Sequence, residues 1–158
     1  MNAASKMYGT VQTALLCCFA SSVFFGPVAS PIPYGATLGI AGSVLSVVGV
    51  VLLLGAIVGI RQAIQIEPEP RPGATLVTTG IYRWFRHPIY TAILMCVVGL
   101  ALRRPTLLVG IAAAAVVVFL FVKVRLEEKL LVERYPEYSQ YRSRTWGIVP
   151  WPHAPSKP

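Results

Sequence analysis

The feature that most constrains this chain is the run from residue 35 to residue 60, which contains no charged side chain. About 20 apolar residues are enough for a helix to cross the hydrocarbon core of a bilayer. Further uncharged runs occupy about 11–28, 88–102 and 106–122. Because lipid offers no partner for backbone polar groups, such runs form helices. The sequence therefore predicts an all-α, polytopic membrane helix bundle with about four transmembrane helices and a cytosolic C-terminal helical extension.

The charge pattern supports the same class of protein. Only 13% of the residues are charged and 55% are hydrophobic, whereas about a quarter of the residues of a soluble domain are charged. A net charge of +8 would also suit nucleic-acid binding. The basic residues, however, lie at the ends of apolar runs, where cytosolic loops place them. We therefore expect the lipid bilayer, and no nucleic acid, as a partner.

The distribution of lysine and arginine also predicts the orientation. Of the 14 basic residues, only Arg103 and Arg104 fall on the outer side of a four-helix arrangement. By the positive-inside rule, both termini are cytosolic. The first apolar run follows Lys6 as in a signal peptide, but a second run follows at once, so we interpret it as a membrane helix. We expect an integral protein of a bacterial or archaeal inner membrane.

The chain is predicted to form a single membrane domain over residues 1–158. Residues 1–62 supply two helices, and residues 63–87 a cytosolic connection whose proline-rich part, 67–73, should be extended. Residues 88–158 supply a helix hairpin and a tail that form the cofactor site. Small residues recur at helical spacing in the second run and predict a helix-packing face. They are Gly35, Gly39, Gly42, Ser46, Gly49 and Ala56.

Several kinds of catalytic site are excluded. The chain has no aspartate and only two histidines, so a Ser-His-Asp triad cannot be built. Zinc ligands and glycine-rich phosphate loops are also missing from the sequence, and we predict no metal site. The three cysteines lie inside apolar runs and form no disulfide framework.

A basic pair, Arg86-His87, directly precedes Pro88 at the start of the third apolar run. Proline suits the first position of a helix and keeps the preceding residue out of the α conformation. The first N–H groups of a helix attract anions, and two basic side chains beside them strengthen the attraction. We therefore expect an anion site where this helix meets the membrane edge.

Two carboxylates, Glu127 and Glu128, are predicted to face this basic pair across the hairpin. If the returning helix is level with Pro88 near Leu120, the glutamates lie on the order of 11 Å beyond Pro88. An extended cofactor could bridge that gap. Alternatively, the glutamates only pair at helical spacing with the neighbouring basic residues Lys123, Arg125 or Lys129.

At these residues the chain resembles the isoprenylcysteine carboxyl methyltransferases and the related phospholipid methyltransferases. The family pattern is a GxYxxxRHPxY segment, a helix hairpin, EExxL and a tyrosine-rich tail. It appears here as residues 80–90, then 127–131, then 135–141. The chain departs from common family choices at Ile81, Ala92 and Tyr135-Pro136, and its tail reads Arg144-Thr145-Trp146-Gly147.

The resemblance implies S-adenosylmethionine as cofactor and a membrane methyltransferase as the activity. It implies a lipophilic acceptor with a carboxylate, thiol or amine head, as in isoprenylcysteine carboxyl methylation. Arg86 and Glu128 become the candidate catalytic residues. The candidate cofactor-binding residues are Tyr82, Arg86, His87, Pro88, Tyr90, Glu127, Glu128, Leu131, Tyr138 and Tyr141.

Two other functions fit the sequence less well. Membrane sterol reductases share a related C-terminal half and use NADPH, but they have more spans than this chain offers. A non-enzymatic membrane module that kept the fold is the third reading, favoured by the departures from the family pattern.

Overall fold

A computed structural model describes residues 3–27, 35–64 and 76–150. This part of the chain is helical, with only an isolated bridge between Phe85 and Trp146 and no β-strand. The all-helical prediction is confirmed, while the expected extended segment 67–73 lies outside the described residues. The helices are α1 (Ala3–Phe25), α2 (Gly35–Ile64), the 3-10 helix η1 (Gly80–Arg83), α3 (Pro88–Arg103), α4 (Leu107–Arg134) and α5 (Tyr138–Arg144).

Three of the described helices are long and apolar enough to cross a membrane, over Met7–Phe25, Gly35–Gly59 and Leu107–Arg134. The fourth expected span, α3, is apolar but has only 16 residues. At about 1.5 Å per residue, it is shorter than a bilayer core of about 30 Å. The long neighbours α2 and α4 therefore extend past α3, and the polar residues of the hairpin gather where α3 begins.

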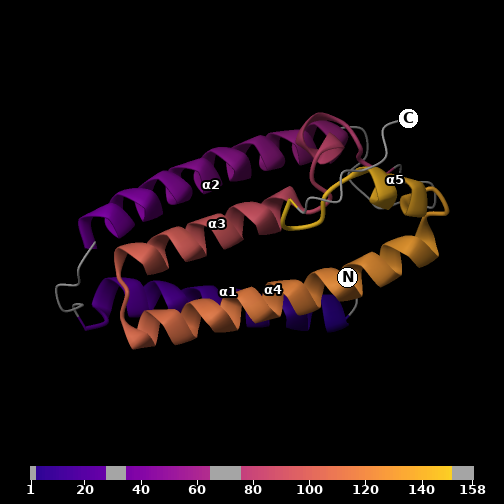
Figure 1. Ribbon diagram of the computed structural model, residues 1–158. Coiled ribbons are helices and arrows are strands. Elements are labelled where there is room, and N and C mark those ends of the chain that lie inside the picture. Colours follow the sequence, from indigo (N-terminus) through magenta and orange to yellow (C-terminus); the bar gives the residue numbers. More distant parts are fainter. Residues whose placement is uncertain (1–2, 28–34, 65–75, 151–158) are drawn as a thin grey trace.

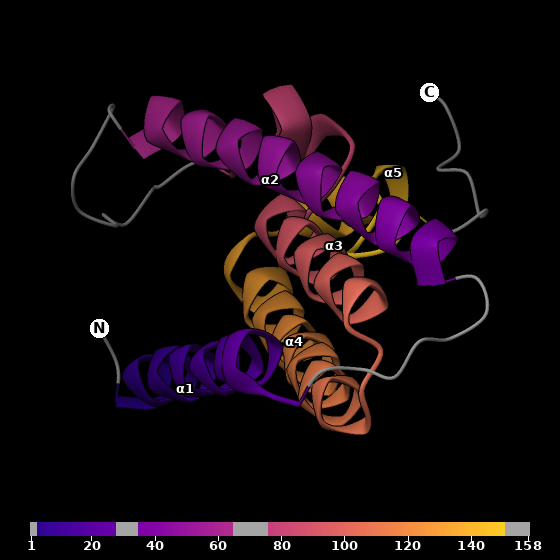
Figure 2. The same cartoon turned by 90° about the vertical axis from the view of Figure 1, so that its left-hand side faces the viewer.

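The helices pack in the spatial order α2, α3, α4, α1 (Figures 1 and 2). Helices α1 and α2 are neighbours in the sequence but lie on opposite sides of the α3–α4 pair. Thr106 caps α4, because its side chain accepts a hydrogen bond from the Val109 N–H at 3.3 Å. The cap follows directly after the short connection that joins the end of α3 to α4. The two helices therefore form the hairpin that the sequence predicts.

The interface between α2 and α3 is built on small residues. A Cβ atom added to Gly99 would lie 2.5 Å from the Gly42 carbonyl oxygen, and one added to Gly49 would lie 2.8 Å from Cys96 Sγ. The predicted packing face is thus confirmed at Gly42 and Gly49, and Ala56 of the same stripe is fully buried. Gly39 has no neighbour within 4 Å of an added Cβ, so the contact does not extend to it.

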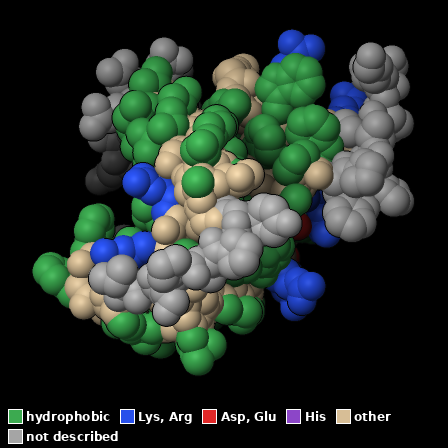
Figure 3. Space-filling model, turned by 60° about the vertical axis from the view of Figure 1, so that its left-hand side comes forward, with side chains coloured by type: hydrophobic (Ala, Val, Ile, Leu, Met, Phe, Trp, Pro, Cys, Tyr) green, Lys and Arg blue, Asp and Glu red, His purple; other side chains and the backbone are tan. Residues whose placement is uncertain are grey.

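A second apolar core joins α1 and α4 to the inner face of α3. Its buried members are Phe19, Val23, Val97, Val109, Ala113, Val116 and Leu120. The outward faces stay apolar too: Ile40, Val44, Val47 and Val51 of α2 are exposed. Figure 3 shows hydrophobic side chains spread over this side of the molecule. An exposed apolar surface of this extent suits contact with lipid.

The tail folds back onto the start of α3. Arg86 N–H donates to the Trp146 carbonyl at 2.8 Å, and Trp146 N–H donates to the Trp84 carbonyl at 2.9 Å. The Trp146 ring lies against Trp84 and Phe85, with centroid distances of 6.2 and 5.6 Å. As a result, residues 145–148 run beside Arg86 and enclose the polar end of the bundle.

Candidate functional site

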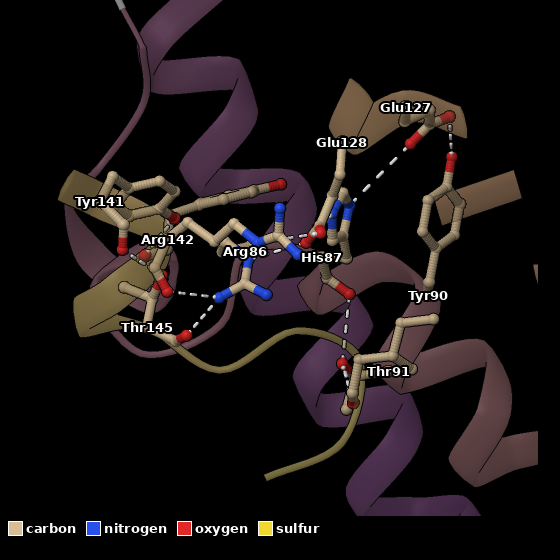
Figure 4. A network of polar contacts seen from close by, with 11 residues as sticks. Arg86, His87, Tyr90, Thr91, Glu127, Glu128, Tyr141, Arg142 and Thr145 are labelled. Atoms are coloured by element: carbon tan, nitrogen blue, oxygen red, sulfur yellow. Dashed lines mark hydrogen bonds and ion pairs between the residues drawn. The ribbon is translucent and has the colours of Figure 1, made fainter. Parts of the chain in front are cut away.

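The candidate site lies at one end of the bundle, where four segments meet (Figure 4). They are the start of α3, the last turns of α4, the short helix α5 and residues 145–148. Pro88 is the first residue of α3, and His87 has non-helical angles of φ −125° and ψ 57°. The sequence prediction for this boundary is confirmed. The His87 carbonyl accepts the Thr91 N–H at 3.0 Å, which fixes the direction in which the basic pair leaves the helix.

Arg86 is the centre of the polar contacts. Its Nε donates to Glu128 Oε1 at 2.9 Å, and its Nη1 donates to the Arg142 carbonyl at 2.9 Å and to the Thr145 carbonyl. Only 11% of the Arg86 side chain is exposed. One guanidinium group therefore joins α4 to α5 and to the segment after it.

Glu128 is held by three basic side chains. Besides Arg86, it lies 3.4 Å from Arg142 Nε and 3.5 Å from His87 Nε2. The prediction of an open gap between the basic pair and Glu128, which a cofactor would bridge, is therefore wrong. The expected distance of about 11 Å is counted along the helix axis from Pro88, whereas Arg86 and His87 precede Pro88 and lie outside α3. The long arginine side chain spans the remaining distance.

Glu127 has a separate set of partners. It accepts a hydrogen bond from Tyr90 Oη at 2.7 Å and lies 3.9 Å from both His87 Nδ1 and Lys123 Nζ. The alternative pairing at helical spacing thus applies to Glu127, through Lys123, and not to Glu128. The His87 and Tyr90 rings stack with centroids 5.7 Å apart and join the two carboxylates into one cluster.

Three of the candidate tyrosines form a buried wall beside this cluster. Tyr141 Oη donates to the Tyr82 carbonyl at 2.6 Å, and the Tyr138 and Tyr141 rings meet edge to face at 5.8 Å. Gly80, with φ 60°, lets the chain turn into η1 and so brings Tyr82 to this place. Leu131, one turn beyond Glu127, is half-buried on α4.

Buried polar atoms of this wall and of the adjacent His87 lack hydrogen-bond partners in the described part of the chain. They are Tyr82 Oη, Tyr138 Oη and His87 Nε2, and a fourth, Trp146 Nε1, lies in the returning tail. Burial raises the pKa of Tyr82 to about 12. Burial, together with the charge of Glu128, raises the pKa of Tyr138 to about 12. Both hydroxyls are therefore neutral donors at ordinary pH, and unpaired buried donors are costly.

Sequence reasoning missed several residues of the site. Thr91 Oγ1 donates to the Ile148 carbonyl at 2.7 Å and ties the tail to α3. A Cβ added to Gly147 would lie 3.3 Å from Arg86 Nη2, so this glycine lets the tail approach the guanidinium. The only signal in the sequence was the unusual tail at Arg144-Thr145-Trp146-Gly147. The described residues contain no group of three side chains suited to hold a metal.

Comparison with known proteins agrees with this geometry. Residues 40–138 match the phospholipid methyltransferase family and include most of the site. The chain is 32% identical over 94 residues to protein-S-isoprenylcysteine O-methyltransferase of Saccharomyces cerevisiae, covering 54% of this chain and 37% of that protein. It is 31% identical over 77 residues to methanethiol S-methyltransferase 1 of Bradyrhizobium diazoefficiens, covering 47% of this chain and 26% of that protein.

A third relative has a different description. The chain is 31% identical over 115 residues to the cobalt-zinc-cadmium resistance protein CzcN of Cupriavidus metallidurans, covering 72% of this chain and 48% of that protein. The chain spans about half or less of the length of these relatives, and no solved structure matches it. From the family match, which covers more than half of its residues, the chain belongs to the phospholipid methyltransferase family.

Proposed function

We propose that this chain transfers a methyl group from S-adenosylmethionine to a lipophilic acceptor held at the membrane edge. The observation that carries the proposal is the cluster of Arg86, His87 and Glu128 beside buried, unpaired hydroxyls at the end of an apolar bundle. Relatives named as methyltransferases support the reaction class. Their acceptors differ, so the acceptor of this chain is argued from its own residues.

The residues present fit the polar groups of this cofactor. Its methionine part carries a carboxylate and an ammonium group, and its ribose carries hydroxyls. His87 Nε2 and the unpaired hydroxyls of Tyr82 and Tyr138 are available as buried donors. Glu127 and Glu128 supply acceptors for hydroxyl or ammonium protons. When bound, S-adenosylmethionine supplies a methyl group that is electrophilic because it is attached to a positively charged sulfur.

We propose different roles for the two candidate catalytic residues. Arg86 already donates from Nε and Nη1 to acceptors of the chain itself, so we assign it the role of positioning Glu128 and the tail. Burial alone would raise the pKa of Glu128, but His87, Arg86 and Arg142 lower it to about 2, so its carboxylate stays ionised and we assign it the role of an acceptor for the cofactor. Tyr90 stacks on His87 and contacts Lys123 with its ring, so it shapes this side of the site, while Tyr141 offers an aromatic face to a nearby cation.

The site needs no strong general base if the acceptor is already ionised. Holding donor and acceptor in line then supplies much of the rate. An apolar tail of the acceptor would be buried against the membrane-facing helices at about 25 cal/mol per Å². Rates for one nucleophile with tails of increasing length test this part. Rates that do not change with tail length would rule out a lipophilic acceptor.

Binding of S-adenosylhomocysteine to detergent-solubilised protein, measured by calorimetry, tests the cofactor. We expect His87→Ala and Glu128→Gln each to weaken binding by about 10- to 100-fold, because charge-assisted hydrogen bonds contribute about 1.5–3 kcal/mol. Glu133→Gln is the matched control, since Glu133 lies exposed on the same helix. Tighter binding of NADPH would favour a reductase, and no binding of either would favour a non-enzymatic module.

We also propose that the termini and the site face the cytosol. Single cysteines at positions 4 and 157, in a chain whose Cys17, Cys18 and Cys96 are replaced by alanine, report the orientation. A membrane-impermeant thiol reagent applied to intact cells should leave both unlabelled. Strong labelling at either position contradicts the proposed orientation.

A further inference from the structure

Lys123 is the first charged residue after the apolar part of α4, because residues 107–122 carry no charge. Its side chain is only 17% exposed. Holding an ammonium group at the edge of a membrane is costly, and such residues generally face a partner or a substrate. The surroundings of Lys123 therefore indicate what it binds.

Within the described residues, the ammonium group of Lys123 uses only part of its hydrogen-bonding capacity. It donates one hydrogen bond, to Gln12 Oε1 of α1 at 2.7 Å. Glu127 Oε1 lies 3.9 Å away, beyond hydrogen-bond distance, and already accepts the Tyr90 hydroxyl at 2.7 Å. The Tyr90 ring centroid is 5.2 Å from Nζ and offers a weak cation–π contact. An ammonium group has three donors, so most of its capacity is left for another acceptor.

Gln12 adds a second donor at the same place. Lysine can only donate, so the Gln12 amide turns its oxygen toward Lys123, and the NH₂ group on the same carbon atom takes no part in that hydrogen bond. Among the described residues, this NH₂ group makes no hydrogen bond. Lys123 and Gln12 thus present adjacent N–H donors from α4 and α1, which lie against each other (Figure 2). Adjacent donors match the two oxygens of a carboxylate.

The position of this pair connects it to the candidate cofactor site. Tyr90 contacts Lys123 with its ring and stacks on His87, and Glu127 lies between Lys123 and His87. One helical turn before Gln12 and Lys123 in the sequence, Tyr8 of α1 and Phe119 of α4 bring their ring centroids 6.4 Å apart. A head group at Lys123 would therefore lie beside the cofactor cluster, with apolar side chains next to it.

We propose that Lys123 and Gln12 bind the head group of the methyl acceptor and select a carboxylate. This inference rests on the proposed methyl transfer and narrows its acceptor class from carboxylate, thiol or amine to carboxylate. An amine head is disfavoured, because in its protonated form it would repel Lys123 and offer no acceptor to either donor. The acceptor is then an amphiphile with an apolar tail and an anionic head.

The test measures binding of three single-chain probes, dodecanoate, dodecanol and dodecylamine, to the detergent-solubilised chain. The wild-type protein should bind dodecanoate at least tenfold more tightly than dodecanol, and dodecylamine more weakly than either. Lys123→Gln should reduce dodecanoate affinity at least tenfold and leave dodecanol affinity unchanged. Gln12→Glu should do the same by placing a competing carboxylate on Lys123, which keeps the test valid if Lys123→Gln does not fold.

Lys129→Gln is the matched control, because Lys129 is exposed on the same helix and its loss changes the net charge equally. An equal loss of dodecanoate affinity in this control, or a loss of less than tenfold in both site variants, overturns the carboxylate site. Titration of the same preparations with S-adenosylhomocysteine separates the two proposals. Absence of that binding overturns the cofactor assignment, whereas the dodecanoate result alone decides the acceptor site.

Discussion

The two interfaces of α3 are built in opposite ways. Toward α2, α3 presents Gly99 and lets the backbones approach until a Cβ atom would overlap Ser46 Oγ at 2.4 Å. Toward the last turns of α4, the residues just before α3 present Arg86 and His87, and the contact depends on polar groups that lie 2.9–3.5 Å from Glu128. One interface is stabilised by the shape of small residues, the other by a few directional contacts.

We infer that the α2–α3 interface is the rigid part of the bundle and that the polar end is the adaptable part. Small residues packed against backbone have no rotamers to change, so the α2–α3 interface fixes where Pro88 and His87 lie. At the polar end, a carboxylate can accept hydrogen bonds from a different donor, and a guanidinium group can donate to a different acceptor. These side chains can therefore exchange a protein partner for a ligand. We therefore expect that a ligand bound at the polar end would leave the α2–α3 packing undisturbed.

The largest effect is expected from Gly99→Leu. Its side chain would be forced into Ser46 and the Gly42 carbonyl, and overpacking of this kind costs about 3 kcal/mol. Thermal unfolding in detergent should show a strongly lowered midpoint. Gly110→Ala is the control, because Gly110 has open space and alanine favours helix there by about 0.5–1 kcal/mol. Equal stability of Gly99→Leu and wild type would mean that the close approach does not exist.

The second-largest effect is expected from Arg86→Lys, which keeps the positive charge and removes the planar guanidinium group with its several N–H donors. A lysine cannot reach Glu128 and the carbonyls of Arg142 and Thr145 together, so the tail should open about 2 kcal/mol more easily. Hydrogen exchange at residues 142–148 should accelerate by about 30-fold. Arg125→Lys, at an exposed position on α4, should leave it unchanged. Unaltered exchange in Arg86→Lys would show that Arg86 does not hold the tail.

A smaller loss is expected from Thr91→Val, which keeps the shape of the buried side chain and removes its hydroxyl. The Ile148 carbonyl then loses its partner, at a cost of about 1–2 kcal/mol. The rate of hydrogen exchange at residues 146–149 should rise in Thr91→Val, while in Thr91→Ser it should stay near the wild-type rate. If exchange in Thr91→Val stays at the wild-type rate while it rises in Thr91→Ser, the methyl group of Thr91 and not the hydrogen bond stabilises the tail.

The sequence predicts the first interface of this comparison much better than the second. Small residues at spacings of three and four identify the α2 packing face, and Pro88 identifies the start of α3, because both depend on local periodicity and backbone geometry. The continuation of α4 to Arg134 agrees with the C-terminal helical extension expected from the sequence.

The polar end could not be predicted to the same degree because its contacts join distant segments. Arg86 contacts Thr145 across 59 positions, and Lys123 contacts Gln12 across 111 positions. No periodicity relates such residues. Spacing arithmetic placed Glu128 on the correct side of the bundle, but it omitted the reach of the arginine side chain and therefore predicted a gap where there is an ion pair.

The smallest effect is expected from Tyr141→Phe, which removes one hydrogen bond to the Tyr82 carbonyl and about 1 kcal/mol of stability. Burial raises the pKa of Tyr141 above its usual value near 10. A group with a raised folded-state pKa contributes its full stability below the unfolded pKa and loses it as pH rises further. The difference in unfolding free energy between wild type and Tyr141→Phe should thus stay constant from pH 6 to about pH 9 and shrink above about pH 10. A difference that already declines between pH 6 and 9 would show that the hydroxyl of Tyr141 is not held as a neutral donor.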